Sequence, residues 1–405
     1  MRQNDNSDFY RKYNFLPTLT KISSNTPDLL RQYCSSRAYL FEKCLKFPIT
    51  GLQNIEYLEI GPDSGENALV AAIFGARISV IDKNPRAIEV CSQKFEELHL
   101  KDRLISAEVV GLEDYTTDRV FGFVAAEGFV HSMADKKGAF ANLRNLVSPN
   151  GFLLLSFYEK YSCFADLLHS RLFKEIVKLK FGREWSQLAI EHVVDYGQEL
   201  FEPKWNLKSH SRSLRSWIMD IALNPSLDWE LTIDSQALVN EMCKEGFELW
   251  ESWPSYSERS EMYWHRDIRS SEIENELIVN YLKKRTLAHF FGVDITLDQE
   301  ELSSTLEKLL FYLNNYQWDL ALHCVKELES YLSKIPLPKD KLIELTILTG
   351  MLSKIFTDAS AGDKSALENL VKGQSTDSKY DFGKKFLNFW GQPNHFALFK
   401  RKALV

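Results

Sequence analysis

Residues 58–67 have the sequence LEIGPDSGEN, and this stretch decides the fold class of the chain. Residues 55–60 have the pattern of a short β-strand, and a helix-like pattern begins at Asn67. Gly61 and Gly65 lie between the two patterns. Glycine lets the backbone turn tightly and lets a ligand lie against it. A strand, a glycine turn and a helix in this order favour a nucleotide-binding α/β fold, although similar turns also occur without a ligand.

Strand and helix patterns alternate on both sides of this turn. The further strands are predicted at residues 77–81, 104–110, 120–126, 152–158, 246–251 and 395–401. The helices between them are predicted at residues 67–74, 85–98, 138–147 and 235–245, and a turn at 148–151 precedes the fifth strand. Such alternation predicts crossover connections and a mostly parallel sheet.

Two interruptions of this alternation predict additional parts. The predicted division is an N-terminal helical cap (1–50), an α/β core (51–158, 233–257 and 394–405), a substrate lid (159–232) and an α-helical insertion (258–393). The lid is rich in aromatic residues and histidine. The helical part is interpreted as an insertion because a terminal strand would close the sheet. It contains one helix pair, residues 315–332, that faintly resembles a tetratricopeptide repeat.

Composition narrows the functional class. The chain has 405 residues, of which 44% are hydrophobic and 26% charged, with a formal net charge of -7. This balance of charges argues against a protein that binds duplex nucleic acid, because such binding needs clustered Lys and Arg. The sequence contains neither an apolar run long enough to span a membrane nor a secretory signal. Six cysteines without a C-x-x-C pair indicate no metal site and favour a reducing, cytoplasmic location.

Asp82 is the second informative residue. It ends the strand predicted at 77–81, 17 positions after Gly65, where a carboxylate can accept hydrogen bonds from two ribose hydroxyls. The alternative is a helix N-cap, since Asn84 and Pro85 open the next helix. The two roles are compatible.

Taken together, these stretches resemble class I S-adenosylmethionine-dependent methyltransferases. In that family's first motif, an acidic residue precedes three glycines at alternate positions, and Glu59, Gly61 and Gly65 match it, whereas Asp63 replaces the middle glycine. The resemblance covers residues 55–158, with 233–252 and 394–402 as the sixth and seventh strands. It implies a Rossmann-like, seven-stranded, mostly parallel sheet whose antiparallel last strand lies beside the sixth.

The resemblance also implies a cofactor, S-adenosylmethionine, and the residues that bind it. Asp82 is expected at the ribose, and Glu113 or Leu112 at the adenine. The complete expected set is Glu59, Gly61, Pro62, Asp63, Gly65, Asp82, Lys83, Leu112, Glu113, Glu127 and Gly128.

Three residues are candidates for the acceptor side of the reaction. His131 follows the fourth strand and could accept a proton near neutral pH. Tyr158 follows the fifth strand, and His192 lies in the lid with acidic neighbours. The alternative for each histidine is a structural or solvated side chain. No base is needed unless the acceptor must lose a proton.

The sequence therefore predicts a methyltransferase that acts on an O, N or C atom of a small molecule, in a specialised biosynthetic pathway. Two alternatives stay open: a scaffold or regulator that keeps the fold, and a protein methyltransferase that docks its substrate on the helical insertion. A homodimer formed through that insertion is a further expectation. A nicotinamide oxidoreductase is disfavoured because Pro62 and Asp63 stand where its motif needs close backbone approach.

Overall fold

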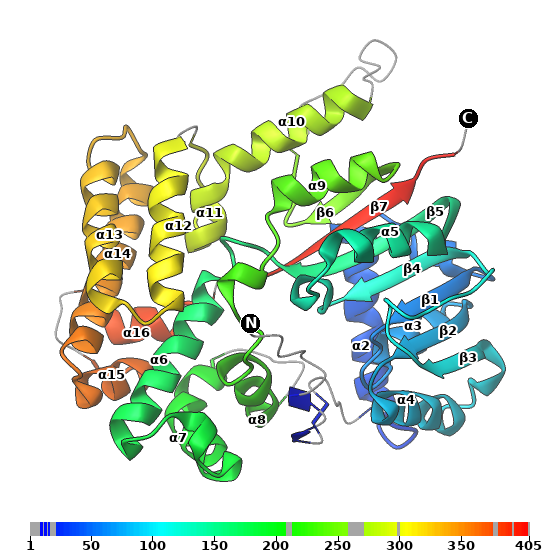
Figure 1. Cartoon of the computed structure of the whole chain (residues 1–405), viewed down its shortest axis with the longest axis horizontal. Coiled ribbons are helices and arrows are strands. Elements are labelled where there is room, and N and C mark those ends of the chain that lie inside the picture. Colours follow the sequence, from blue (N-terminus) through cyan, green and yellow to red (C-terminus); the bar gives the residue numbers. More distant parts are fainter. Residues whose placement is uncertain are drawn as a thin grey trace. The chain divides into compact units, whose positions relative to one another are not determined.

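The chain folds into two compact units. A computed structural model describes residues 9–10, 12–13, 15–16, 22–207, 213–257, 271–297, 300–375, 380–390 and 393–403. Unit 1 comprises residues 1–158, 233–282 and 394–405, and unit 2 comprises residues 159–232 and 283–393 (Figure 1). Among the described residues, no helix combines the length and apolar character needed to cross a membrane.

A seven-stranded sheet forms the centre of unit 1. Its strands are β1 (Glu56–Ile60), β2 (Arg77–Asp82), β3 (Leu104–Val109), β4 (Phe121–Glu127), β5 (Val147–Tyr158), β6 (Phe247–Trp253) and β7 (Asn394–Arg401). The strand order is β3-β2-β1-β4-β5-β7-β6, and β7 pairs antiparallel with both β5 and β6. The other pairs are parallel. The predicted Rossmann-like fold, with its antiparallel last strand, is confirmed.

Helices cover both faces of the sheet and create two cores. The helices of unit 1 are α2 (Pro27–Tyr39), α3 (Glu66–Ile73), α4 (Pro85–Glu97), α5 (Lys136–Leu146), α9 (Ser235–Lys244) and α10 (Ser271–Lys284). Apolar residues of α5 and α9 share one core with Leu58 and Ile60. Apolar residues of α3 and α4 share the other core with Tyr57. Alternate β1 residues therefore point to opposite faces, as expected for a strand covered on both sides.

Unit 2 is helical in its described residues. Its helices are α6 (Phe164–Phe181), α7 (Ile190–Trp205), α8 (Leu214–Trp217), α11 (Thr286–Phe291), α12 (Glu300–Asn314), α13 (Trp318–Leu332), α14 (Lys339–Ser360), α15 (Lys364–Val371) and α16 (Phe382–Leu387). Residues 159–232 and the helices after residue 283 thus share one compact unit. The long helix α6 is buried along most of its length.

Two segments differ from their sequence-based prediction, and a third lies outside the described residues. Strand β5 begins at Val147, and the predicted turn at 148–151 is an irregular part of the strand where the register with β4 shifts. The N-terminal helical pattern was too long, because residues 22–26 are not helical and α2 begins only at Pro27. Residues 258–270, at the start of the predicted helical insertion, lie outside the described residues.

Candidate functional site

The glycine turn between β1 and α3 is held in left-handed backbone conformations. Gly61 and Gly65 have φ angles of 70° and 87°, and Asp63 has a φ of 51°. A Cβ on Gly65 would lie 2.6 Å from the Cys91 sulfur, so α4 packs directly against this turn. Asp and Asn are the residue types, other than glycine, that most readily adopt the left-handed region. Asp63 therefore replaces the family's middle glycine without losing the backbone shape.

Asp82 lies beside this turn at the carboxyl end of β2. Its carboxylate accepts a hydrogen bond from the Asn84 N–H at 2.7 Å and another from the Asp63 N–H. Burial raises the pKa of Asp82 from 3.8 to about 6, although these hydrogen bonds and Lys83 oppose the shift. The N-cap of α4 is Asn84, whose side chain accepts from the Arg86 N–H at 3.1 Å. The cap role considered for Asp82 thus belongs to Asn84.

The loop after β3 contains Leu112 and Glu113, the two residues expected at the adenine, and Lys83 directly follows β2. Lys83 and Glu113 form an ion pair in which both side chains are partly exposed. Leu112 is only 3% exposed and packs into the core with Leu58 and Ile60. The side chain of Leu112 therefore has a packing role in this loop, whichever residue contacts a ligand.

A buried charge cluster lies at the carboxyl ends of β1 and β4. The Arg37 guanidinium of α2 donates two hydrogen bonds to the Glu127 carboxylate, at 2.7 and 2.9 Å. Glu59 is 2% exposed, and burial together with the charge of Glu127 raises its pKa well above the usual range. Two buried atoms of this cluster, Oε2 of Glu59 and Nε of Arg37, have no hydrogen-bond partner among the described residues.

A hydrogen-bonded chain supports Glu59 from α2 and α3. The Tyr33 hydroxyl donates to the Asn67 carbonyl at 2.8 Å, and the Asn67 amide in turn bonds the Glu59 carboxyl group. Glu66 forms a separate buried ion pair with Lys94. Arg37 and Tyr33 were not predicted from the sequence, although their i, i+4 spacing places both on one face of a helix.

Gly128 gives this edge of the sheet an open position. It has a φ of 82°, and a Cβ built on it would meet no atom within 4 Å. Its N–H donates to the Ser156 carbonyl at 2.8 Å, which fixes the end of β4 against β5. Glu127 and Gly128 therefore lie where the strand order reverses, because β1 and β4 are sheet neighbours whose helices cover opposite faces.

The structure brings His131 and Tyr158 together. Their rings are in edge-to-face contact, with centroids 4.9 Å apart, and the Tyr158 N–H donates a long hydrogen bond of 3.5 Å to His131 Nδ1. Burial and nearby Lys136 lower the pKa of His131 to about 3. His131 is therefore neutral at physiological pH, with its proton on Nε2. His192 is an exposed residue of α7 in unit 2.

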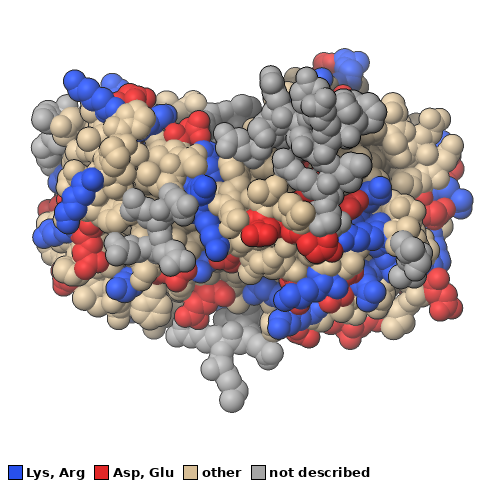
Figure 2. Space-filling model, turned by 90° about the horizontal axis from the view of Figure 1, so that it is seen from above, with Lys and Arg blue, Asp and Glu red and all other residues tan. Residues whose placement is uncertain are grey.

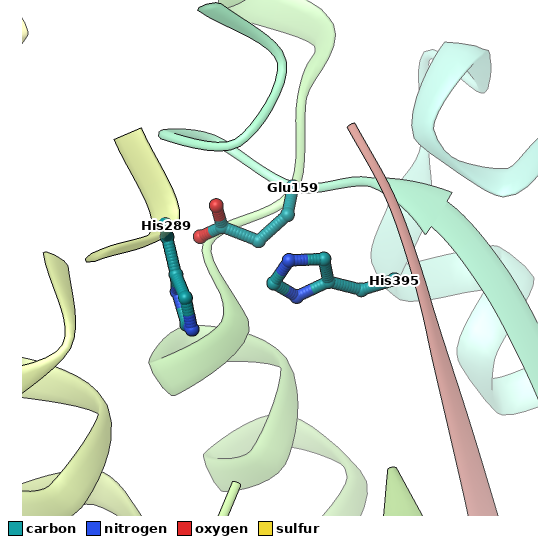
Figure 3. A group of neighbouring side chains, drawn as sticks. All are labelled: Glu159, His289 and His395. Atoms are coloured by element: carbon teal, nitrogen blue, oxygen red, sulfur yellow. The ribbon is translucent and has the colours of Figure 1, made fainter. Parts of the chain in front are cut away.

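Figure 3 draws three further polar residues, Glu159, His289 and His395. Glu159 and His289 belong to unit 2. Each offers an atom that could ligate a metal, and these two atoms lie within 4.8 Å of each other. The Glu159 carboxylate accepts from the N–H groups of Tyr161 and Ser162, both at 2.8 Å. In unit 1, His395 Nδ1 lies 2.8 Å from the Tyr256 hydroxyl. Glu159 and His395 thus each have hydrogen-bond partners within their own unit.

Several solved structures are similar to parts of this chain. N-methyltransferase NodS from Bradyrhizobium japonicum WM9, solved with S-adenosyl-L-homocysteine, is 18% identical over 38% of this chain and 75% of its own, with a TM-score of 0.29. Glycopeptide N-methyltransferase MtfA, solved with sinefungin, is 17% identical over 32% of this chain, with a TM-score of 0.27, and the match spans only 56% of its own length. The [4+2]-cyclase SpnF is 12% identical over 87% of this chain and 76% of its own, with a TM-score of 0.34.

No curated protein sequence matches the chain. The family model described as "Methyltransferase domain" matches residues 28–252. That region includes six of the seven strands, the glycine turn and the charge cluster. Because the match covers more than half of the 405 residues, the chain belongs to the methyltransferase-domain family, the class of S-adenosylmethionine-dependent enzymes that its sequence resembles.

Proposed function

We propose that this enzyme binds S-adenosylmethionine at the carboxyl edge of β1, β2 and β4 and transfers its methyl group to a small-molecule acceptor. The observation that carries the proposal is the left-handed turn at Gly61, Asp63 and Gly65, with the buried Asp82 carboxylate beside it. A tight turn and an acidic residue at the end of the next strand are what a ligand with a ribose requires.

The charge cluster fits the amino-acid part of this cofactor. Glu59 has a buried carboxyl oxygen without a hydrogen-bond partner in the described part of the chain, and an ammonium group would satisfy it. Arg37 already uses both terminal nitrogens on Glu127, but its Nε–H has no partner among the described residues and can donate to a carboxylate. Asp82 would hold the ribose hydroxyls. When bound, the cofactor supplies a methyl group already activated on a sulfonium.

The protein's task is then mainly alignment. Transfer is an in-line displacement, so the residues must hold donor and acceptor at close approach and exclude water. His131 is neutral and carries its proton on Nε2, so it can donate a hydrogen bond to an acceptor atom but is a weak base in this environment. Tyr158, in ring contact with His131, lies beside it. The participation of His131, Tyr158 and His192 in the reaction stays a prediction.

The proposal is tested by measuring S-adenosylmethionine binding by calorimetry on the full chain. Asp82→Ala is expected to weaken binding by about tenfold or more, which corresponds to ~1.4 kcal/mol. Asp114→Ala is the matched control, since Asp114 is an exposed carboxylate on the loop after β3. If the unchanged protein fails to bind the cofactor, the enzymatic proposal is wrong and the scaffold alternative takes its place.

The class of acceptor needs a second measurement. The enzyme is incubated with methyl-labelled cofactor and a cell extract separated into small-molecule and protein fractions. Label in the small-molecule fraction supports the proposal, whereas label found only in protein favours the protein methyltransferase. The specialised pathway, the lid role of residues 159–232, the cytoplasmic location and a homodimer are further parts of the same proposal.

A further inference from the structure

A groove of about 710 Å³ lies on the surface of unit 2, between α12 and α13. Ser304, Thr305 and Lys308 line it from α12. The wall opposite is formed by one face of α13 and the turn after it, including His323, Lys326, Ser330 and Lys334. Its polar wall residues are exposed except Thr305 and Tyr331, which are partly buried, and the apolar face of α13 is buried. The groove lies after residue 252, outside the region that matches the methyltransferase family.

Charges are segregated around this groove. Lys308, Lys326 and Lys334 are the only Lys or Arg residues between positions 302 and 334, and all three line the groove. The same span contains four acidic residues, of which only Glu327 lines the groove, and Glu327 is paired with His323 at 3.3 Å. On the face drawn in Figure 2, Lys and Arg residues are interspersed with Asp and Glu residues.

The acidic residues outside the groove are occupied by contacts within unit 2. Glu307 accepts hydrogen bonds from Lys160 at 2.6 Å and from the Tyr161 hydroxyl at 3.0 Å. Asp319 accepts from the Ser360 hydroxyl, and Glu329 from the Ser353 hydroxyl at 3.4 Å. The three lysines, in contrast, form no ion pair with any described residue. Positive charge is therefore available along the groove.

The spacing of the lysines favours an elongated ligand. Lys326 and Lys334 are eight positions apart, which corresponds to about 12 Å along a helix. An elongated ligand with several carboxylates can pair with each lysine separately. An extended peptide advances roughly 3.3 Å per residue, so a segment of about four residues spans the distance. The hydroxyl groups of Ser304, Thr305 and Ser330 add hydrogen-bonding partners for its backbone.

We propose that the groove between α12 and α13 binds an extended acidic segment of a partner protein, with its carboxylates on Lys308, Lys326 and Lys334. Ammonium–carboxylate contacts provide charge-assisted hydrogen bonds and electrostatic steering. This surface is independent of the cofactor site, which consists of unit 1 residues.

The test uses a fluorescein-labelled peptide of alternating Glu and Gly, with a Gln and Gly peptide as the neutral probe. Fluorescence anisotropy on the full chain should show binding of the acidic peptide only, weakening with added salt. The triple variant K308Q/K326Q/K334Q should bind it at least about tenfold more weakly. The triple arginine variant, K308R/K326R/K334R, should retain binding because it retains the charge.

The matched control is K137Q/K283Q/K339Q, which removes the same charge from three exposed lysines outside the groove. The proposal is overturned by an absence of binding to the unchanged chain or by equal losses in the two glutamine variants. Tighter, lysine-dependent binding of a single-stranded oligonucleotide would also overturn it and make the groove a nucleic-acid site. Cofactor binding by K308Q/K326Q/K334Q should be unchanged, so this test and that of the proposed function fail separately.

Discussion

At the residue scale, the position of Gly65 imposes two requirements that only glycine meets together. Its φ of 87° disfavours a side chain, and a Cβ there would also meet the sulfur and the Cα of Cys91, at 2.6 and 3.1 Å. Gly65→Ala should lower the free energy of unfolding by about 3 kcal/mol, the sum of a left-handed penalty of ~1–2 kcal/mol and an overpacking penalty of ~1–3 kcal/mol. Urea unfolding followed by tryptophan fluorescence measures the change.

Gly246 provides the matched control for that substitution. Its φ of 81° is almost the same, but a Cβ there would meet no atom within 4 Å. Gly246→Ala should therefore cost only the backbone penalty, about 1 kcal/mol. Equal losses in the two alanine variants would mean that close packing against Cys91 contributes nothing.

Asp82 makes cofactor affinity depend on pH. Its pKa of about 6 in the free protein means that the carboxyl group is protonated below that pH, whereas two ribose hydroxyls donate to the charged form. The dissociation constant should thus be constant above pH 6 and rise below it, by at most about tenfold per pH unit. In Asp82→Asn, affinity should be low and lose this pH dependence. Calorimetry between pH 5 and 8 distinguishes the two, and an unchanged pH profile in the variant would assign the dependence to another group.

The pattern of residues predicts the site unevenly. Gly61, Gly65 and Asp82 were identifiable because their spacing relative to the strands is fixed by the fold. Arg37 was not, since it lies 22 positions before Glu59 and meets Glu127 only through tertiary packing. The burial that lowers the pKa of His131 was equally invisible, because a sequence window around His131 does not show what covers it.

At the element scale, α2 is attached to the sheet edge by the Arg37–Glu127 pair. The two side chains are 9% and 12% exposed, so removal of either partner leaves a buried charge unpaired. Arg37→Met and Glu127→Leu should each lower the stability of the protein by about 3–5 kcal/mol, and the double variant should lose much less than the sum. Urea unfolding of the four proteins gives the coupling energy.

A second pair on the same helix serves as the reference. Arg31 and Asp28 form an ion pair with exposed fractions of 74% and 79%, so Arg31→Met should have little effect. Additive losses for Arg37→Met and Glu127→Leu would instead show that the two residues contribute independently of each other.

Element positions were predictable where a strand or helix has its own periodicity. The strand patterns at 77–81 and 395–401 differ from β2 and β7 by only one residue. The agreement is close because strands covered by helices on both faces have a recognisable apolar pattern. The start of β5 was missed since Pro149 and Gly151 are turn-forming residues locally, yet Val147 pairs with Phe121 across the sheet. Tertiary pairing overrides local turn preference there.

At the scale of the whole molecule, the connectivity of the sheet was the most predictable feature. The strand pattern at residues 395–401 needs partner strands, and β7 lies between β5 and β6. How residues 159–232 and the later helices combine could not be derived in the same way. Their packing into one unit depends on long-range contacts of helices such as α6, for which no repeating pattern exists in the sequence.

The six cysteines are distributed over both units. Cys34 and Cys243 are half-buried, whereas the other four are buried, two in unit 1 (Cys44, Cys91) and two in unit 2 (Cys163, Cys324). Disulfide exchange requires an accessible thiolate. Titration of the native protein with Ellman's reagent should therefore show two reactive thiols, and denaturant should expose the other four. Burial raises the pKa of Cys34, so its reaction should be slower than that of a free thiol.

Substitution of Cys34 and Cys243 by serine tests whether these two thiols cause the fast reaction or whether partial unfolding exposes the buried ones. The double variant should show no fast phase while its total in denaturant falls from six thiols to four. Because each buried pair belongs to one unit, the urea concentration at which each pair reacts reports the stability of that unit. A cofactor bound only to unit 1 should shift the reaction of Cys44 and Cys91 to higher urea. An equal shift for Cys163 and Cys324 would mean that the two units unfold as one cooperative structure.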